Sequence, residues 1–161
     1  MTQLHAVASG CMTQLTTAPT PMTGLELMQA LQAGDVPAPG FAVTLGIEPV
    51  AFSEGRAAFA LDPGPEHLSP LGTVHGGILS TLLDSAVGCA IHTTLGASDL
   101  YTTVDLDVKF VRPVRPGQGR VTAEARTVHV GGRIATAEGR IVDEDGTLYA
   151  HATTTCLITR A

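Results

Sequence analysis

The sequence predicts an α+β fold in which an antiparallel β-sheet wraps around one long central α-helix. The helix candidate covers about 75–95, where apolar residues recur every three or four positions and the residues between them are small. Four long segments with strand character follow it, separated by turn signals. The 161 residues are 44% hydrophobic and only 15% charged, which favours one domain with a large core.

The segment before the long helix has its own start and stop signals. Thr23 is a candidate N-cap for a helix over 24–32, and Gly34 is its candidate stop. Residues 62–72 contain three prolines and two glycines, which predicts a loop. The other expected elements before the long helix are a short turn at 41–45 and strands at 47–52 and 56–61.

Short hairpins connect the strands that are expected after the long helix. Gly131-Gly132 and Asp145-Gly146 are typical of tight turns between antiparallel strands. In chain order, the strands are expected at 100–111, 118–130, 133–142 and 147–159.

The remaining composition indicates where such a protein works. Residues 1–21 show no periodicity and are expected to be a poorly ordered tail, with a single domain over 22–161. The net charge is −6 and Lys109 is the one lysine, which argues against nucleic acid or an anionic membrane as the partner. Three widely spaced cysteines and a start without basic residues favour the cytoplasm.

The familiar catalytic motifs are missing from the sequence. There is no GxSxG, HExxH, GxxxxGK[ST] or GxGxxG motif, and no two histidines are spaced to bind a metal from one helix. We therefore expect neither a metal nor a cofactor.

Asp84 lies in the middle of the most apolar helix. Aspartate is a weak helix former and is rarely buried without a partner. One interpretation is structural, with the carboxylate facing water or capping a loop. The other is functional, with a carboxylate in a partly apolar pocket acting as a base or nucleophile.

The start of this helix reads His75-Gly76-Gly77. Two glycines weaken the first turn, but they let another molecule approach the free N–H groups, which suit a developing oxyanion. Close packing against a strand is the alternative. Gly76 and Asp84 are about 12 Å apart along one helix. If both serve one reaction, they come from different chains, as in a dimer with antiparallel helices across a two-fold axis.

Two stretches resemble the PaaI-type (phenylacetate-degradation type) family of hotdog-fold acyl-CoA thioesterases. One is HLSPLGTVHGG at 67–77 with Asp84 seven positions later, and the other is YTTVDLDVKFVRP at 101–113. The resemblance extends from about 22 to 158. It implies the hotdog fold and hydrolysis of an aryl- or medium-chain acyl-CoA by a homodimer, often paired into a homotetramer.

The resemblance also implies roles for single residues. Asp84 matches the family's base or nucleophile, and Gly76 matches the N–H that polarises the thioester carbonyl. His75 would support the site, and Thr103 would orient the water or the carboxylate. Ser69 stands where the family usually has asparagine, which puts its role in question because a hydroxyl has one donor and an amide has two. Further substrate-binding candidates on the helix are Gly77, Thr81 and Leu83.

Other questions stay open at this level. Pocket depth depends on the first helix and on the phenylalanines, and the CoA phosphates could lie on basic residues that are equally consistent with ordinary surface charges. A non-catalytic protein that binds acyl-CoA or an acyl carrier is an alternative on the same fold. An enoyl-CoA hydratase is a weaker alternative. Hydratases of this fold usually pair an aspartate with a histidine a few residues later, whereas Asp84 and His92 are eight positions apart. The phenylalanines that could set the pocket depth are Phe41, Phe52, Phe59 and Phe110. The basic residues that could meet the CoA phosphates are Lys109, Arg112, Arg115 and Arg133.

Overall fold

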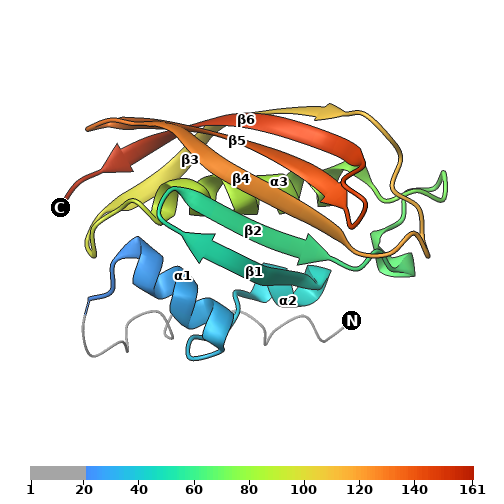
Figure 1. Ribbon diagram of the computed structural model, residues 1–161, viewed down its shortest axis with the longest axis horizontal. Coiled ribbons are helices and arrows are strands. Elements are labelled where there is room, and N and C mark those ends of the chain that lie inside the picture. Colours follow the sequence, from blue (N-terminus) through green and yellow to red (C-terminus); the bar gives the residue numbers. More distant parts are fainter. Residues whose placement is uncertain (1–20) are drawn as a thin grey trace, which may run out of the picture.

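The computed structural model describes residues 21–161, so the expected tail lies outside the described residues apart from Pro21. The elements follow the predicted order along the chain (Figure 1). They are α1 (Gly24–Ala33), α2 (Gly40–Leu45), β1 (Ile47–Ser53), β2 (Arg56–Leu61), a 3-10 turn (Pro65–His67), α3 (Gly76–His92), β3 (Leu100–Phe110), β4 (Val121–Val130), β5 (Ile134–Asp143) and β6 (Leu148–Thr159).

The first helix begins and ends where its caps predict. The Thr23 side chain accepts a hydrogen bond from the Glu26 N–H, and the Glu26 carboxylate accepts one from the Thr23 N–H. This reciprocal pair satisfies two N–H groups that have no partner inside the helix. At the other end, Gly34 adopts a left-handed conformation with φ of 81° and stops the helix.

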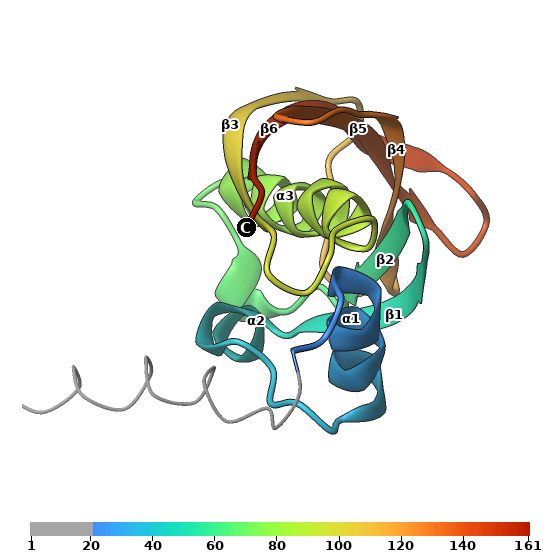
Figure 2. The same ribbon diagram turned by 90° about the vertical axis from the view of Figure 1, so that its left-hand side faces the viewer.

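The six strands form one antiparallel sheet that curves around α3 (Figure 2). Their order is β1-β2-β4-β5-β6-β3, so β1 and β3 are the edge strands. The apolar core lies between the inner face of the sheet and α3. This arrangement confirms the predicted hotdog fold class.

Small residues on the inner face let α3 approach the sheet closely. Ala125, Gly139 and Ala152 are paired neighbours on β4, β5 and β6, and all three are buried. A Cβ atom on Gly139 would lie 2.8 Å from Cγ1 of Val87 on α3. A larger side chain in this row would therefore push the helix away from the sheet.

Two predicted boundaries are wrong by a few residues. The long helix ends at His92 rather than near 95, and β4 begins at Val121 rather than at 118. The late start of β4 has a local cause, because Gly117 and Gly119 have φ values of 74° and 97°, which an extended strand does not allow.

A β-bulge in β3 changes which side chains face the helix. Thr103 pairs with Cys156 and Asp105 pairs with Thr155, so Val104 is the extra residue. Without the bulge, strict alternation would turn Asp105 toward the helix together with Thr103. With it, Thr103 and Leu106 are half-buried while Asp105 is exposed. The bulge therefore turns Thr103, and not Asp105, toward the helix.

Candidate active site

The loop before α3 is held in shape by a buried histidine and a short bridge. The His67 ring accepts a hydrogen bond from the Gly64 N–H at Nδ1, 2.9 Å away, and its Nε2 lies 3.0 Å from the Leu45 carbonyl oxygen. An isolated β-bridge joins Leu68 to Val74. The chain therefore enters α3 from a fixed direction.

His75 is the N-cap of α3. Its Nδ1 accepts a hydrogen bond from the Gly77 N–H at 2.9 Å. The neighbouring Gly76 N–H has no hydrogen-bond acceptor among residues 21–161. The first turn of the helix thus offers one free N–H donor at the positive end of its dipole, which is suited to a carbonyl oxygen that becomes negative.

A cavity of about 350 Å³ opens beside Gly76. Phe110 forms part of its wall, and a Cβ atom on Gly76 would lie 3.1 Å from the Phe110 Cζ atom. Glycine at this position therefore leaves room for the aromatic ring next to the free N–H. The other lining residues are mostly apolar and come from the start of α3 and the chain after β3: Thr73, Val74, Leu79, Val111, Arg112, Pro113 and Val114.

Ser69 is half-buried in the turn before the helix. Its Oγ atom accepts a hydrogen bond from the Leu71 N–H at 3.3 Å and lies 3.5 Å from the Thr73 hydroxyl. The serine hydroxyl thus contacts its own turn, and either Ser69 or Thr73 can be the donor in the contact between their hydroxyls.

Asp84 is half-buried two turns further along α3. Its Oδ1 accepts a hydrogen bond from the Thr103 hydroxyl at 3.1 Å. No lysine, arginine or histidine among residues 21–161 forms an ion pair with it. The second carboxylate oxygen is thus available to a water molecule or a substrate.

Burial favours the neutral form of three ionisable side chains on α3 and β3. Burial raises the pKa of the Cys89 thiol to about 12, and burial also raises the pKa of the Tyr101 hydroxyl. Burial lowers the pKa of His92, whose ring lies against Tyr101 with centroids 5.3 Å apart. The Cys89 thiol and the His92 imidazole are therefore uncharged at neutral pH.

The structure brings some predicted residues together and separates others. Asp84 contacts Thr103, while Gly76 lines a cavity that Asp84 does not line. The Thr81 hydroxyl donates to the Gly77 carbonyl oxygen at 2.9 Å. Leu83 is fully buried in the core, so within one protomer it has no surface to offer a substrate.

Only one of the four phenylalanines lines this cavity. Phe52 and Phe59 pack edge to face with ring centroids 5.3 Å apart, and Phe41 is exposed on α2. Phe110, half-exposed at the end of β3, is the one beside Gly76. The sequence places Phe110 in the strand that carries the family resemblance, but it gives no sign of this contact because the two residues are 34 positions apart.

The comparisons with known proteins agree with the observed fold. Residues 71–150 match the model of the thioesterase superfamily. In structure, the chain is similar to a mutant of the phenylacetic acid degradation protein PaaI from Thermus thermophilus, with 32% identity and a TM-score of 0.66 over 73% of this chain and 96% of the other. The chain belongs to the thioesterase superfamily, a class of thioester hydrolases with the hotdog fold.

Curated relatives match parts of the chain. A protein of Halobacterium salinarum assigned to the esterases is 38% identical over 84 residues, 51% of this chain and 54% of its own length. The match thus spans about half of that relative. The 1,4-dihydroxy-2-naphthoyl-CoA hydrolase of Listeria monocytogenes is 26% identical over 105 residues, 65% of this chain and 84% of its own.

Two features are absent from residues 21–161. No group of three or more histidine, cysteine, aspartate or glutamate side chains is arranged to hold a metal ion. None of the described helices is long and apolar enough to cross a membrane.

Proposed function

We propose that the protein is an acyl-CoA thioesterase that hydrolyses an aryl- or medium-chain acyl-CoA to the free acid and CoA. The observation that carries this proposal is the half-buried Asp84 carboxylate, which is held by Thr103 and lacks a cationic partner in the described chain. The family membership supports the reaction type, and the naphthoyl-CoA hydrolase among the relatives supports an aryl substrate. The cytoplasm stays the predicted location.

In this mechanism, the Gly76 N–H donates a hydrogen bond to the thioester carbonyl oxygen. Asp84 takes a proton from water, whose oxygen attacks the carbonyl carbon, and the negative charge on the tetrahedral intermediate develops beside the Gly76 N–H. The carbon–sulfur bond then breaks, and Asp84 gives the proton to the CoA sulfur, which leaves as the thiol and regenerates the carboxylate. Direct attack by the carboxylate, through an anhydride that water hydrolyses, uses the same groups.

Thr103, Ser69 and His75 act on the positions of these groups. The Thr103 hydroxyl holds one oxygen of Asp84 and directs the other toward the water. When Thr73 is the donor in the contact between the two hydroxyls, Ser69 can donate its own hydrogen to the water or the thioester. His75 fixes the first turn by accepting from Gly77, which leaves the Gly76 N–H as the free donor.

The proposed site is shared by two protomers. Gly76 and Asp84 lie eight positions apart on α3, about 12 Å along its axis, so one thioester cannot contact both in a single chain. The edge strand β3 leaves one side unpaired over 11 residues and exposes apolar side chains at Leu100, Val104 and Phe110. Pairing of this edge with a second copy would set the two α3 helices side by side.

The acyl group is proposed to lie in the cavity beside Gly76. Its walls are largely apolar, and Phe110 presents an aromatic ring next to the N–H donor. Arg112 at the same cavity donates to the Leu148 carbonyl oxygen and is the basic residue placed best to meet the CoA part of the substrate.

The test is release of CoA thiol from a panel of acyl-CoA substrates. The panel contains phenylacetyl-, benzoyl-, hexanoyl- and acetyl-CoA, and the wild-type protein is compared with Asp84→Asn. We expect kcat to fall by roughly 10²–10⁴-fold in the variant, because it loses the base. Asp145→Asn, at an exposed turn, is the matched control and keeps the wild-type rate.

Two outcomes would contradict the proposal. Near-normal turnover by Asp84→Asn would show that another group is the base. Tight binding of acyl-CoA without release of thiol by the wild-type protein would instead favour the non-catalytic binding protein, with Ser69 as the first residue to exchange for asparagine.

A further inference from the structure

One row of residues on α3 faces β3, the edge strand that passes beside it (Figure 2). Its members are separated by multiples of four positions, so they lie on one side of the helix. The row members that contact β3 are Gly76, Asp84 and Gly88, and their neighbours on β3 are, in the same order, Phe110, Thr103 and Tyr101. The polar contact of Asp84 therefore lies between two places where an aromatic ring packs against a glycine.

Gly88 is buried under the ring of Tyr101. A Cβ atom on Gly88 would lie 3.0 Å from the Tyr101 Cε2 atom and 3.1 Å from its hydroxyl oxygen. Contacts between carbon atoms are normally about 3.5–4.0 Å, so the ring would have to move by roughly 0.5 Å. The backbone of Gly88 is helical, and glycine weakens a helix interior relative to alanine. The close approach of the ring therefore explains why glycine fits this position.

The Tyr101 ring has little room to turn away from Gly88. It also packs against the ring of His92, with centroids 5.3 Å apart, and its hydroxyl lies against the Cys89 thiol. His92 in turn is confined by the start of α1, because a Cβ atom on Gly24 would lie 2.7 Å from the His92 Cδ2 atom. A methyl group on residue 88 would therefore displace β3 together with the ring.

The contact at Gly88 controls the neighbouring contact at Asp84. Thr103 follows Tyr101 by two positions on the same side of β3, which is roughly 6.6 Å along the strand. Asp84 precedes Gly88 by one helical turn, about 6 Å along α3. The hydrogen bond from Thr103 to Asp84 is 3.1 Å, already long for a bond between two oxygens. A displacement of β3 by roughly 0.5 Å would therefore break it.

We propose that Gly88 is a positioning residue that lets Tyr101 pack directly against α3. This close packing keeps β3 near enough for Thr103 to hold the Asp84 carboxylate. The inference rests on the proposed function, in which that carboxylate takes a proton from water. Gly88 acts only through the spacing of α3 and β3, since it does not line the cavity beside Gly76.

The first test compares Gly88→Ala with the wild-type protein in crystal structures and in kinetics. We expect the distance from Thr103 Oγ1 to Asp84 Oδ1 to grow by roughly 0.5 Å. The value of kcat should fall by about tenfold with little change in KM, because the base is misplaced while the contacts with the substrate stay.

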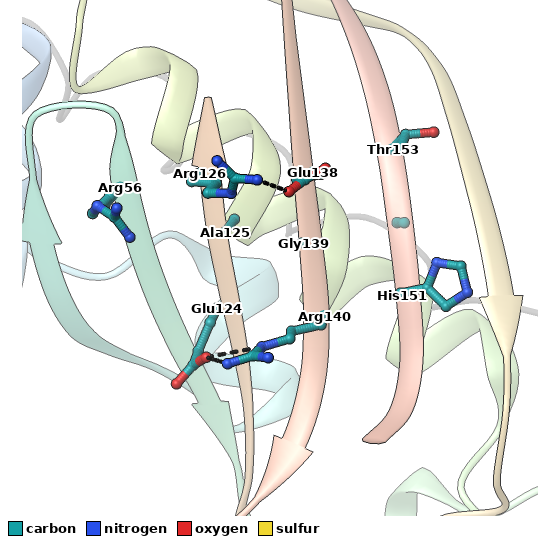
Figure 3. Close-up of a pocket in the computed structure, with 10 residues that line it drawn as sticks. Arg56, Glu124, Ala125, Arg126, Glu138, Gly139, Arg140, His151 and Thr153 are labelled. Carbon is teal, nitrogen blue, oxygen red and sulfur yellow. Dashed lines mark hydrogen bonds and ion pairs between the residues drawn. The ribbon is translucent and has the colours of Figure 1, made fainter. Parts of the chain in front are cut away.

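Val87→Ala is the matched control on the next residue of α3. Val87 packs against Gly139, which lies on β5 rather than on β3 (Figure 3). Its truncation leaves a cavity and lowers the melting temperature, but it does not alter the contact between α3 and β3. The control should therefore keep the wild-type kcat.

Two double variants separate positioning from a general loss of packing. Once Thr103→Ala has removed the hydroxyl that holds Asp84, adding Gly88→Ala should lower kcat by less than about twofold, whereas independent losses would multiply. In a Tyr101→Leu background, Gly88→Ala should also cost less than about twofold, because leucine lacks the ring atoms that meet the new methyl group.

The inference and the proposed function can fail separately. An unchanged distance between Thr103 and Asp84 in Gly88→Ala, or a full tenfold loss in the Thr103→Ala background, would overturn the positioning role. Wild-type kcat in Gly88→Ala beside an inactive Asp84→Asn would overturn it too, and would leave the proposed function intact. Normal turnover by Asp84→Asn would overturn the proposed function, and the distance in Gly88→Ala would still decide whether Gly88 sets the spacing.

Discussion

The first turn of α3 and its middle differ in what they can contribute to a reaction. At the first turn, Gly76 provides a free N–H donor beside an apolar cavity, but no carboxylate lines that cavity. In the middle, Asp84 provides a carboxylate held by Thr103, without a free N–H donor of the helix beside it. Each region therefore carries one half of a hydrolytic site, and a second chain is needed to bring the halves together.

Of the changes at the two ends of this comparison, removing the N–H donor at the first turn should lower activity strongly, next to the loss expected for Asp84→Asn. Gly76 is the first helical residue, where proline is well tolerated, and His75 has the extended backbone that a following proline requires. Gly76→Pro should lower kcat by roughly 10²–10³-fold because the oxyanion loses its N–H. Gly76→Ala keeps the N–H and meets the same Phe110 ring, so it should lose far less. Equal losses in the two variants would mean that the Cβ atom, not the N–H, is responsible.

Altering the wall of the cavity should change substrate preference rather than chemistry. In Phe110→Ala, the ratio of kcat/KM for phenylacetyl-CoA to that for hexanoyl-CoA should fall by about tenfold, since the ring that packs against an aryl group is gone. Phe41→Ala removes a phenylalanine of similar exposure that does not line the cavity and should leave the ratio unchanged. A parallel loss for all substrates in Phe110→Ala would argue against an acyl pocket at this position.

The smallest effect should appear in stability at alkaline pH, and it concerns Cys89 near the end of α3. Burial raises the pKa of the Cys89 thiol from its ordinary 9.0 to about 12. Between these values the unfolded chain loses the thiol proton and the folded chain keeps it, so the free energy of unfolding falls as pH rises from 9 toward 12. Cys89→Ala lacks this contribution, and its melting temperature should fall less steeply over that range. Parallel melting curves would show that the thiol titrates alike in both states.

The parts of the fold and the site that the sequence predicts are those that depend on residues close together in the chain. Thr23 and Gly34 mark a helix through backbone chemistry that acts within a few residues. Asp84 stands out because aspartate is a weak helix former and is rarely buried among apolar residues without a partner. The family resemblance then adds the fold and directs attention to Thr103, whose contact with Asp84 the structure contains.

The features that the sequence misses depend on contacts between distant segments. The bulge at Val104 turns Thr103 toward Asp84 and Asp105 away from the helix, and it arises from the register with β6 rather than from a glycine or proline signal. The cavity beside Gly76 needs Phe110, which is brought there by the curvature of the sheet. The ion pairs between β4 and β5, Arg126 with Glu138 and Arg140 with Glu124 (Figure 3), become visible only when the strand order is known.

The shared site can be tested most directly by mixing two inactive variants. Asp84→Asn and Gly76→Pro chains are unfolded, combined in equal amounts and refolded, so that about half of the dimers are hybrids. In a shared site, each hybrid has one intact pair, Asp84 from one chain and Gly76 from the other, and activity should return to about a quarter of the wild-type value. Activity no higher than the mean of the two separate variants would place both groups in the site of a single protomer.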